Sequence, residues 1–395
     1  MTQTQALLSS AKEHMTKNYN PAPFILERGE GVWAWDQDGK KYLDFTSGIA
    51  VNSLGHGHPK VVEAIREQAS RLSHVSNMFH HKGYIDMCQR LCDHSFGDHV
   101  FLCNSGAEAV EAAIKMARLY FHSKGESRPQ MVATHGGFHG RTIGALSLTA
   151  NPKYKVGFEP LMPDVAHVPF NDLDAARKAI TSETAAFIVE PIQGNSGVAV
   201  ADAGYLSELR KICDQTGTLL IVDEIQTAGG RTGKWFDHQH EDMVPDIMPL
   251  AKAIGGGMPL GALVMSKAVS EPLKIGGHGS TYGGNPVACA AGLATWDVVQ
   301  EEGLMEHSVK LGAQFMEMLE GLKSKTELVH SVRGRGLMLG LELTCEARPI
   351  FEKARNAGLL VTLAGTHVLR ILPPMIATES DCAHATSLLE QVLTP

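Results

Sequence analysis

The chain has 395 residues, of which 44% are hydrophobic and 20% charged, so it has the composition of a globular protein and enough length for two or three domains. Its net charge of −8 comes without any basic run, and no apolar stretch reaches membrane-spanning length, which argues against nucleic acid or a membrane as a partner. Seven scattered cysteines, and a first segment without an apolar core or an arginine cluster, favour a cytoplasmic location.

The N-terminal part is predicted to contain a short helix, a hairpin and a longer helix. Residues 7–15 favour a helix, which the prolines at 21 and 23 prevent from continuing. In residues 31–45, two tryptophans alternate with smaller side chains, and Asp38-Gly39 supplies the turn of a hairpin. Residues 61–72 have the periodicity of an amphipathic helix.

Histidines and cysteines in this part raise the question of a metal site. His56 and His58 lie in a glycine-containing loop, but no third ligand is spaced to join them, so we interpret them as ordinary loop histidines. Cys88 and Cys92 lie one helical turn apart and are interpreted as buried or half-buried thiols of a helix.

Residues 101–117 predict a short strand that turns into a helix. Ser105 and Glu108 have the spacing of a capping box. The helix start is therefore either a well-capped terminus or an anion site, in which free N–H groups, a hydroxyl and Gly106 would allow a phosphate to approach. This stretch alone leaves both readings open, although it lacks the glycine and lysine spacing of a nucleotide-binding P-loop.

Two further apolar runs end in side chains suited to ligand binding. Residues 131–133 lead into a glycine-containing loop with Phe138 and Arg141, an aromatic ring that can stack and a guanidinium that can bind a carboxylate through two nitrogens. Residues 185–189 read as a buried strand that ends at the carboxylate of Glu190.

The most informative stretch is 218–256. The apolar run 219–222 reads as a strand buried on both faces, so Asp223 would lie at the crevice where parallel sheets bind ligands. A second apolar run from residue 247 leads to Lys252, which three glycines follow at 255–257. Lys252 is either a lysine that reaches along the surface to solvent or a partly desolvated amine that attacks a carbonyl. Together, an acid and a lysine about thirty positions apart suit pyridoxal phosphate, which needs both.

The C-terminal third has a different character. An amphipathic helix is predicted over 311–322, strands over 337–343, 359–361 and 368–372, and a final helix over 379–393. Arg370 interrupts the last strand and must find an anion there, either a protein carboxylate or the carboxylate of a substrate.

Several of these motifs occur in an order that resembles the class III, or ornithine-type, pyridoxal-phosphate aminotransferases. They are Ser105-Gly-Ala-Glu-Ala, Phe138-His-Gly-Arg-Thr, Glu190-Pro-Ile-Gln-Gly, Asp223-Glu-Ile-Gln, Lys252 with its glycines, and Ser280-Thr-Tyr-Gly-Gly-Asn-Pro. The resemblance implies an α/β architecture of fold type I, with a mostly parallel seven-stranded sheet in a large cofactor-binding domain over residues 50–285. The N-terminal segment 1–49 and residues 286–395 would form a smaller α+β part.

The resemblance also implies roles for individual residues. The cofactor phosphate would be held by Ser105, Gly106, Ala107 and Thr281, and Phe138 would stack on the cofactor ring. Asp223 would pair with the ring nitrogen and Gln226 with the ring oxygen, while Lys252 would bond covalently to the cofactor. The substrate-binding residues would be Arg141, Ser280 and Arg370. Thr281 and Ser280 would reach the site from the second subunit of a homodimer.

The implied reaction transfers the ω-amine of N-acetylornithine, or of a similar ω-amino acid, to 2-oxoglutarate and gives a semialdehyde and glutamate. A γ-aminobutyrate, succinylornithine or diamine donor is the nearest alternative, and an aminomutase that needs no external acceptor is a further one. One position departs from the resemblance: Asn195 stands where ornithine-type members usually have a glutamate that masks the second arginine. An amide cannot neutralise Arg370, so we expect this arginine to stay available to anions throughout the reaction.

Overall fold

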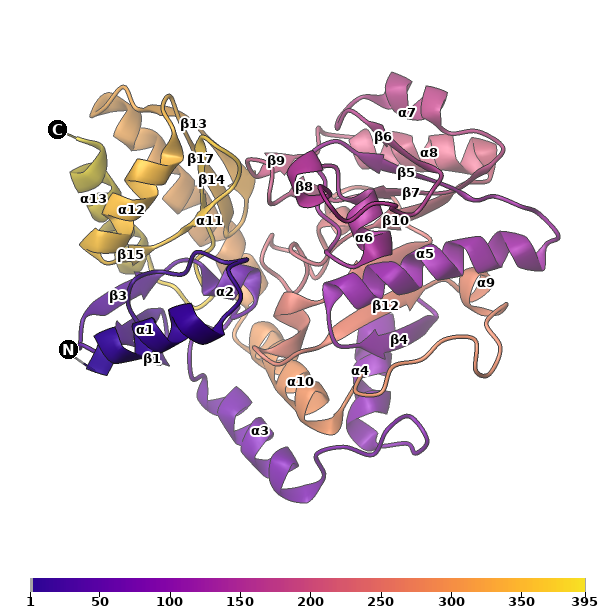
Figure 1. The fold of residues 1–395 in the computed structure, drawn as a ribbon, viewed down its shortest axis with the longest axis horizontal. Coiled ribbons are helices and arrows are strands. Elements are labelled where there is room, and N and C mark those ends of the chain that lie inside the picture. The colour runs from indigo at the N-terminus through magenta and orange to yellow at the C-terminus, as the bar shows by residue number, and fades with distance from the viewer. Residues whose placement is uncertain (1–2, 395) are drawn as a thin grey trace.

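The computed structural model describes residues 3–394 and has two lobes (Figure 1). The larger lobe contains a seven-stranded sheet in the order β4-β12-β11-β10-β7-β5-β6. All pairs among β11, β10, β7, β5 and β6 are parallel, whereas β12 is antiparallel to both of its neighbours. The predicted mostly parallel seven-stranded sheet is therefore confirmed. Its strands are β4 His99–Cys103, β5 Gln130–Thr134, β6 Val165–Val168, β7 Thr184–Val189, β10 Leu219–Val222, β11 Ile247–Leu250 and β12 Gly261–Met265.

Helices cover both faces of this sheet, which explains why its strands read as continuous apolar runs. Along β10, Leu220 packs with α8 (Tyr205–Thr216) on one face, and Ile221 packs with α5 (Gly106–Ser123) on the other. The remaining helices of this lobe are α3 Pro59–Arg71, α4 Lys82–Asp93, α6 Ile143–Leu148, α7 Leu173–Ala179, α9 Lys267–Ser270 and α10 Pro286–Glu301, with the 3₁₀ turns η1 Pro152–Tyr154, η2 Asp237–His240 and η3 Lys252–Gly255.

The smaller lobe is built from the N-terminal segment and the C-terminal third of the chain. Its sheet of β13 Val329–Arg335, β14 Met338–Leu343, β17 Val368–Ile371 and β16 Thr362–Leu363 is accompanied by α11 Leu304–Gly321, η4 Leu322–Ser324, α12 Ala347–Ala357 and α13 Glu379–Leu393. The N-terminal segment contributes α1 Gln3–His14, β1 Leu26–Glu30, β2 Trp33–Asp36 and β3 Lys41–Asp44, and β15 Leu359–Leu360 pairs in parallel with β3. The predicted division at residues 49/50 and 285/286 remains a prediction.

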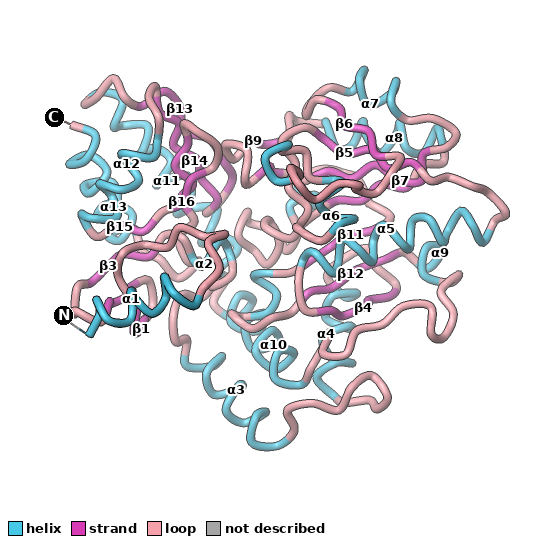
Figure 2. The backbone as a smooth tube through the Cα atoms, viewed as in Figure 1, coloured by secondary structure: helices cyan, strands magenta, loops and turns pink. Residues whose placement is uncertain are grey.

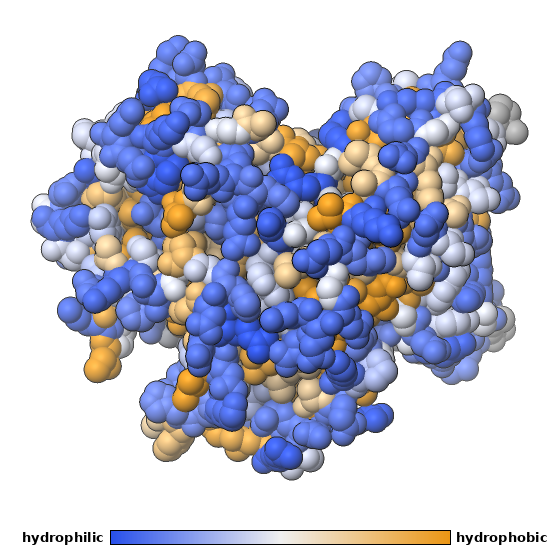
Figure 3. Space-filling model, turned by 180° about the vertical axis from the view of Figure 1, so that it is seen from behind, coloured by the Kyte–Doolittle hydropathy of each residue, from blue (hydrophilic) through white to orange (hydrophobic). Residues whose placement is uncertain are grey.

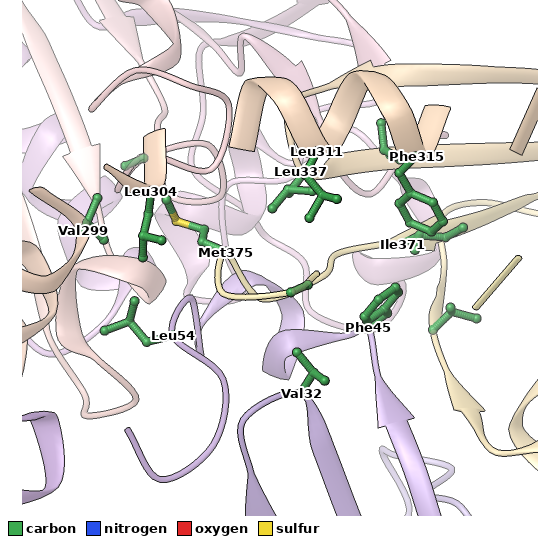
Figure 4. Close-up of a cluster of buried hydrophobic side chains, with 14 of the residues drawn as sticks. Val32, Phe45, Leu54, Val299, Leu304, Leu311, Phe315, Leu337, Ile371 and Met375 are labelled. Carbon is green, nitrogen blue, oxygen red and sulfur yellow. The ribbon is translucent and has the colours of Figure 1, made fainter. Parts of the chain in front are cut away.

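A common hydrophobic core ties the N-terminal segment to the C-terminal third. Figure 4 shows Val32 and Phe45 below Leu311, Phe315 and Ile371, all of them buried. The rings of Phe45 and Phe315 meet edge to face with centroids 5.8 Å apart. Because this contact joins residues far apart in sequence, the N-terminal segment has a fixed place beside the C-terminal sheet.

The predicted hairpin, helices and apolar strands are found close to their expected bounds, except that α11 begins at Leu304 rather than at residue 311. The hairpin turns at Gly39, whose φ of +87° suits glycine, and Cys88 and Cys92 are half-buried on α4. Helix α10 has no counterpart in the sequence prediction because it packs against α3, α4 and η3 and therefore lacks a clear polar face.

Much of the chain between the lobes is loop (Figure 2). Among these loops lie α2 Ser47–Ala50 and the short pair β8 Ile192–Gln193 and β9 Ala199–Val200. Within residues 3–394, no helix is long and apolar enough to cross a lipid bilayer.

Candidate active site

Two buried carboxylates lie next to each other at the carboxyl edge of the large sheet. Val222 of β10 pairs in parallel with Val189 of β7, and the next residues are Asp223 and Glu190. The Asp223 N–H donates to the Val189 carbonyl at 2.8 Å, so the two strands stay paired up to these acids. Their exposed fractions are only 3% and 5%. The carboxyl edge of the sheet, where the topology predicted a ligand crevice, therefore carries a pair of acids.

A buried histidine, His139, is hydrogen-bonded to the Asp223 carboxylate. The His139 Nδ1 lies 2.7 Å from the Asp223 Oδ2, and the Ile225 N–H donates to Oδ1 at 3.1 Å. Burial disfavours a charged imidazole, but the hydrogen bond and charge of Asp223 outweigh it and raise the pKa of His139. The imidazole thus fixes the orientation of the Asp223 carboxylate at this edge of the sheet.

Glu190 anchors the loop that carries Phe138. Its Oε2 accepts the Phe138 N–H at 2.9 Å. Burial, with the charge of Asp223 adding to it, raises the pKa of Glu190 to about 7, although His139 and Lys252 oppose the shift. Phe138 is half-buried, so one part of its ring remains available for stacking.

Lys252 follows β11, the strand next to β10 in the sheet. Its φ of +52° lies in the left-handed region, a conformation that costs a non-glycine residue about 1 kcal/mol or more. Burial lowers its pKa to about 8, and the nearby charge of Arg370 adds to the effect. Within the described chain, no hydrogen bond or ion pair holds its Nζ. Of the two readings of this lysine, a desolvated amine fits better than a side chain that extends to solvent.

The start of α5 offers free backbone N–H groups. The Ser105 Oγ accepts the Glu108 N–H at 3.3 Å, as predicted, but the Glu108 carboxylate bonds the N–H of Asn104 at 2.7 Å rather than that of Ser105. The N–H groups of Gly106 and Ala107 have no acceptor among residues 3–394, as is usual in the first turn of a helix. This 18-residue helix therefore presents a cradle that fits a phosphate group.

Gly106 is required for the position of that cradle. A Cβ at Gly106 would lie 2.7 Å from the Ile225 Cδ1, so a larger residue would push the helix away from the loop after Asp223. The Ser280 Oγ accepts the Gly283 N–H at 3.0 Å and the Asn104 Nδ2 at 3.1 Å, which places the 280–283 loop at the start of α5. Thr281 is exposed on this loop, and its side chain has no partner in the described chain.

Arg370 enters the site from the smaller lobe and is 3% exposed. Its Nη1 donates to the Gly194 carbonyl at 2.9 Å, to the Asn195 Oδ1 at 2.7 Å and to the Gln226 Oε1 at 3.1 Å, while its Nε donates to the Thr362 Oγ1 at 3.0 Å. All four acceptors are neutral. Burial lowers the pKa of Arg370 to about 10. Of the two anions considered, a protein carboxylate is not in contact with it within residues 3–394, and the substrate carboxylate remains the prediction.

Arg141 differs from Arg370 in its surroundings. It is exposed, and its guanidinium lies 3.7 Å from the centroid of the Tyr154 ring and 5.7 Å from that of Phe138. It therefore faces open space beside the predicted stacking ring, where a carboxylate of a bound molecule could reach it.

The structure brings together Lys252, Asp223, Phe138, Gln226 and Arg370, whereas Thr281 points to the surface. The roles predicted for all of these residues remain predictions. The sequence pointed to Glu190, as the carboxylate that ends a buried strand, and to His139, as part of the glycine-containing loop near a ligand. Their bonds to the Phe138 N–H and to Asp223 depend on contacts across the fold, as does the position of Tyr154, for which the sequence indicated no role.

Comparisons with known proteins match this chain over nearly its whole length. The family model described as "Aminotransferase class-III" matches residues 14–393. The acetylornithine aminotransferase of Caldanaerobacter subterraneus is 45% identical over 98% of this chain and 99% of its own length. That of Streptomyces coelicolor is 48% identical over 91% of this chain and 89% of its own.

Solved structures agree with this result. The ornithine aminotransferase of Toxoplasma gondii superposes with a TM-score of 0.95 at 32% identity, covering 100% of this chain and 95% of that one. The acetylornithine aminotransferase of Elizabethkingia anophelis gives a TM-score of 0.89 at 35% identity, covering 100% and 99%.

Proposed function

This chain belongs to the class-III aminotransferases, and on that basis we propose that it transfers the ω-amine of N-acetylornithine to 2-oxoglutarate, giving the acetylated semialdehyde and glutamate. Relatives 42–48% identical to it carry the name acetylornithine aminotransferase. The observation that supports the proposal most directly is Arg370, a buried cation held only by neutral acceptors beside Lys252. Such a cation is suited to the carboxylate of a keto acid whose carbonyl lies at the lysine.

The proposed cofactor is pyridoxal phosphate. The residues fit it: the start of α5 provides N–H groups for a phosphate, Phe138 a ring for stacking, Asp223 an oriented carboxylate and Lys252 an amine. When bound, this cofactor supplies an aldehyde for amine exchange and a protonated ring that takes up an electron pair from the substrate.

The residues of the chain then have distinct tasks. Asp223, oriented by His139, keeps the proton on the ring nitrogen. With the cofactor bound, the Nζ of Lys252 would take the proton from the donor carbon that bears the amine and deliver it to the cofactor carbon that receives the amine. Its pKa of about 8 suits this exchange near neutral pH. Arg141 binds the carboxylate of the ω-amino donor, and Arg370 binds the carboxylate next to the keto group of the acceptor.

The exposed apolar side chains support a homodimer. Met78 and Phe79 are 83% and 68% exposed, and Tyr282 and Ile143 are also largely exposed. Tyr282 adjoins Thr281, the residue proposed to reach the site of the second subunit. The face in Figure 3 is mostly hydrophilic with smaller hydrophobic patches. We also propose a cytoplasmic location, because all seven cysteines are free thiols, as expected in a reducing compartment.

A second candidate follows from Asn195. Because its neutral amide binds Arg370, no carboxylate among residues 3–394 contacts this arginine. A donor with a second acidic group, such as succinylornithine, could then use the free cation. This candidate keeps the same reaction and changes only the preferred donor.

A donor panel tests both candidates. The purified holoprotein would be given N-acetylornithine, succinylornithine, γ-aminobutyrate, ornithine or a diamine, and glutamate formed from 2-oxoglutarate would be measured. The proposal predicts the highest kcat/KM for N-acetylornithine, and a clear preference for succinylornithine would support the second candidate. Turnover without any keto acid would instead indicate an aminomutase.

A further inference from the structure

Tyr154 lies against two residues of the candidate active site and near a third. The Arg141 guanidinium lies 3.7 Å from the centroid of its ring. The Phe138 ring meets it edge to face, with centroids 6.1 Å apart and planes at 90°. It is also close enough to Arg370 to affect the pKa of that arginine, after the larger effects of burial and Glu190. Tyr154 therefore packs against one of the two proposed carboxylate-binding arginines and lies near the other.

The segment around Tyr154 is fixed at both sides. Tyr154 ends η1, whose first turn is capped by the Asn151 Oδ1 accepting the Lys153 N–H at 3.0 Å. The next residue, Lys155, donates from Nζ to the Ser147 carbonyl of α6 at 3.1 Å. Because these bonds flank Tyr154, the backbone that carries its ring is anchored before any substrate binds.

The Arg141 guanidinium contacts only aromatic rings among residues 3–394. Within the described chain its guanidinium has no hydrogen bond or ion pair, and its contacts with the Tyr154 and Phe138 rings are the ones that the structure provides. An exposed arginine with four rotatable side-chain bonds would lose much conformational entropy on binding a carboxylate. A cation over an aromatic ring is already restricted in orientation and keeps its N–H edge free.

We propose that Tyr154 is a positioning residue that holds the Arg141 guanidinium flat and aims its edge at the carboxylate of the substrate. The ring face performs this task, so the phenol hydroxyl is dispensable for it. The inference rests on the proposed function in one respect, namely that Arg141 binds a carboxylate. For 2-oxoglutarate this would be the carboxylate far from the keto group, because Arg370 takes the near one.

The inference therefore separates substrates by their number of carboxylates. N-acetylornithine and 2-oxoglutarate both place a carboxylate at Arg141, whereas pyruvate, with a single carboxylate at Arg370, does not. Because Arg141 is exposed, loss of the Tyr154 ring should raise the KM for the first two by about two- to fivefold, the value of a cation–π contact at an exposed site. It should leave kcat and the KM for pyruvate unchanged.

Three variants test this with matched controls. Tyr154→Leu removes the ring, and Tyr154→Phe keeps the ring without the hydroxyl. Tyr120→Leu removes a similar ring under Lys124, whose Nζ lies 4.0 Å from its centroid on the surface of α5. Steady-state constants would be measured for both keto acids and for N-acetylornithine. Calorimetry would give the Kd of N-acetylnorvaline, which has the donor carboxylate but no ω-amine, and the Tm of each variant would be recorded.

The inference predicts that Tyr154→Leu raises the Kd of N-acetylnorvaline and the KM for 2-oxoglutarate, and that Tyr154→Phe and Tyr120→Leu change neither. Equal binding of the analogue by Tyr154→Leu and the native protein would overturn it, as would a parallel loss with pyruvate. If the native protein does not bind the analogue at all, the proposed donor is refuted. The comparison of 2-oxoglutarate with pyruvate then decides the role of Tyr154 alone.

Discussion

Replacement of Asn195 by aspartate tests whether Arg370 binds the keto acid because no protein carboxylate pairs with it. The side chains are nearly identical in size, and the Asn195 Oδ1 lies 2.7 Å from the Arg370 Nη1, so the substitution places a carboxylate where a neutral oxygen now accepts. At about 4 Å between charge centres and an effective dielectric constant of about 20, the attraction is about 4 kcal/mol. Desolvation of the new carboxylate offsets much of this.

The carboxylate of 2-oxoglutarate would have to displace the new ion pair between the introduced aspartate and Arg370, at a net cost of about 1–2 kcal/mol. This cost corresponds to a rise of about five- to thirtyfold in the KM for 2-oxoglutarate. Steady-state kinetics with saturating donor would measure it. Asn195→Ala is the control, because Gly194 and Gln226 still bind Arg370 in that variant and the cation stays free. We expect this variant to keep the native KM within about threefold. An unchanged KM in Asn195→Asp would refute the account of Arg370 as the keto-acid site.

Three other predictions concern the cofactor, the fold and the assembly. Lys252 should capture added pyridoxal phosphate faster as the pH rises towards about 8, and the rate should level off above that pH, because only the neutral amine reacts. The bond would be trapped with borohydride and located by mass spectrometry. A rate that does not change with pH would contradict a lowered pKa of Lys252. Glu224→Gln should cost about 2–4 kcal/mol of unfolding free energy in urea, because the buried carboxylate accepts the N–H groups of Asp237 and His238 at 2.9 Å and 2.7 Å. Burial alone would raise the pKa of Glu224, but the bonds from His238 outweigh burial and lower it. The stability that the Glu224 carboxylate contributes is therefore present above about pH 4.5 and is lost as the pH falls further. The Glu224→Gln variant should lack this acid-dependent loss of stability. Phe79→Asp should give monomers in sedimentation experiments, and an intact dimer would place the interface elsewhere.

Residues that end buried strands were predictable from the sequence. The apolar runs of β10 and β11 locate Asp223 and Lys252 at the carboxyl edge of the sheet, because parallel strands carry their ligands there. The start of α5 was equally visible, since Ser105 caps the helix as its spacing with Glu108 indicated. In these cases one local pattern determines both the element and the position of the side chain.

Contacts across the fold were not predictable in the same way. Nothing in the local sequence indicates that His139 bonds Asp223, 84 positions later, or that Tyr154 lies under Arg141. The resemblance had placed Asn195 at Arg370, but the other three acceptors, from Gly194, Gln226 and Thr362, come from two separate loops and β16 and could be identified only from the fold. The side chain of Glu108 likewise bonds one residue earlier than a standard capping box.

The central claim is that this site removes the ω-amine of N-acetylornithine and passes it to 2-oxoglutarate. A single-turnover experiment on the purified holoprotein tests it most directly, with the absorbance of the bound cofactor as the readout. The account predicts that N-acetylornithine alone bleaches the absorbance of the aldehyde form rapidly and that 2-oxoglutarate then restores it. Rapid bleaching by another ω-amine, but not by N-acetylornithine, would contradict the proposed donor.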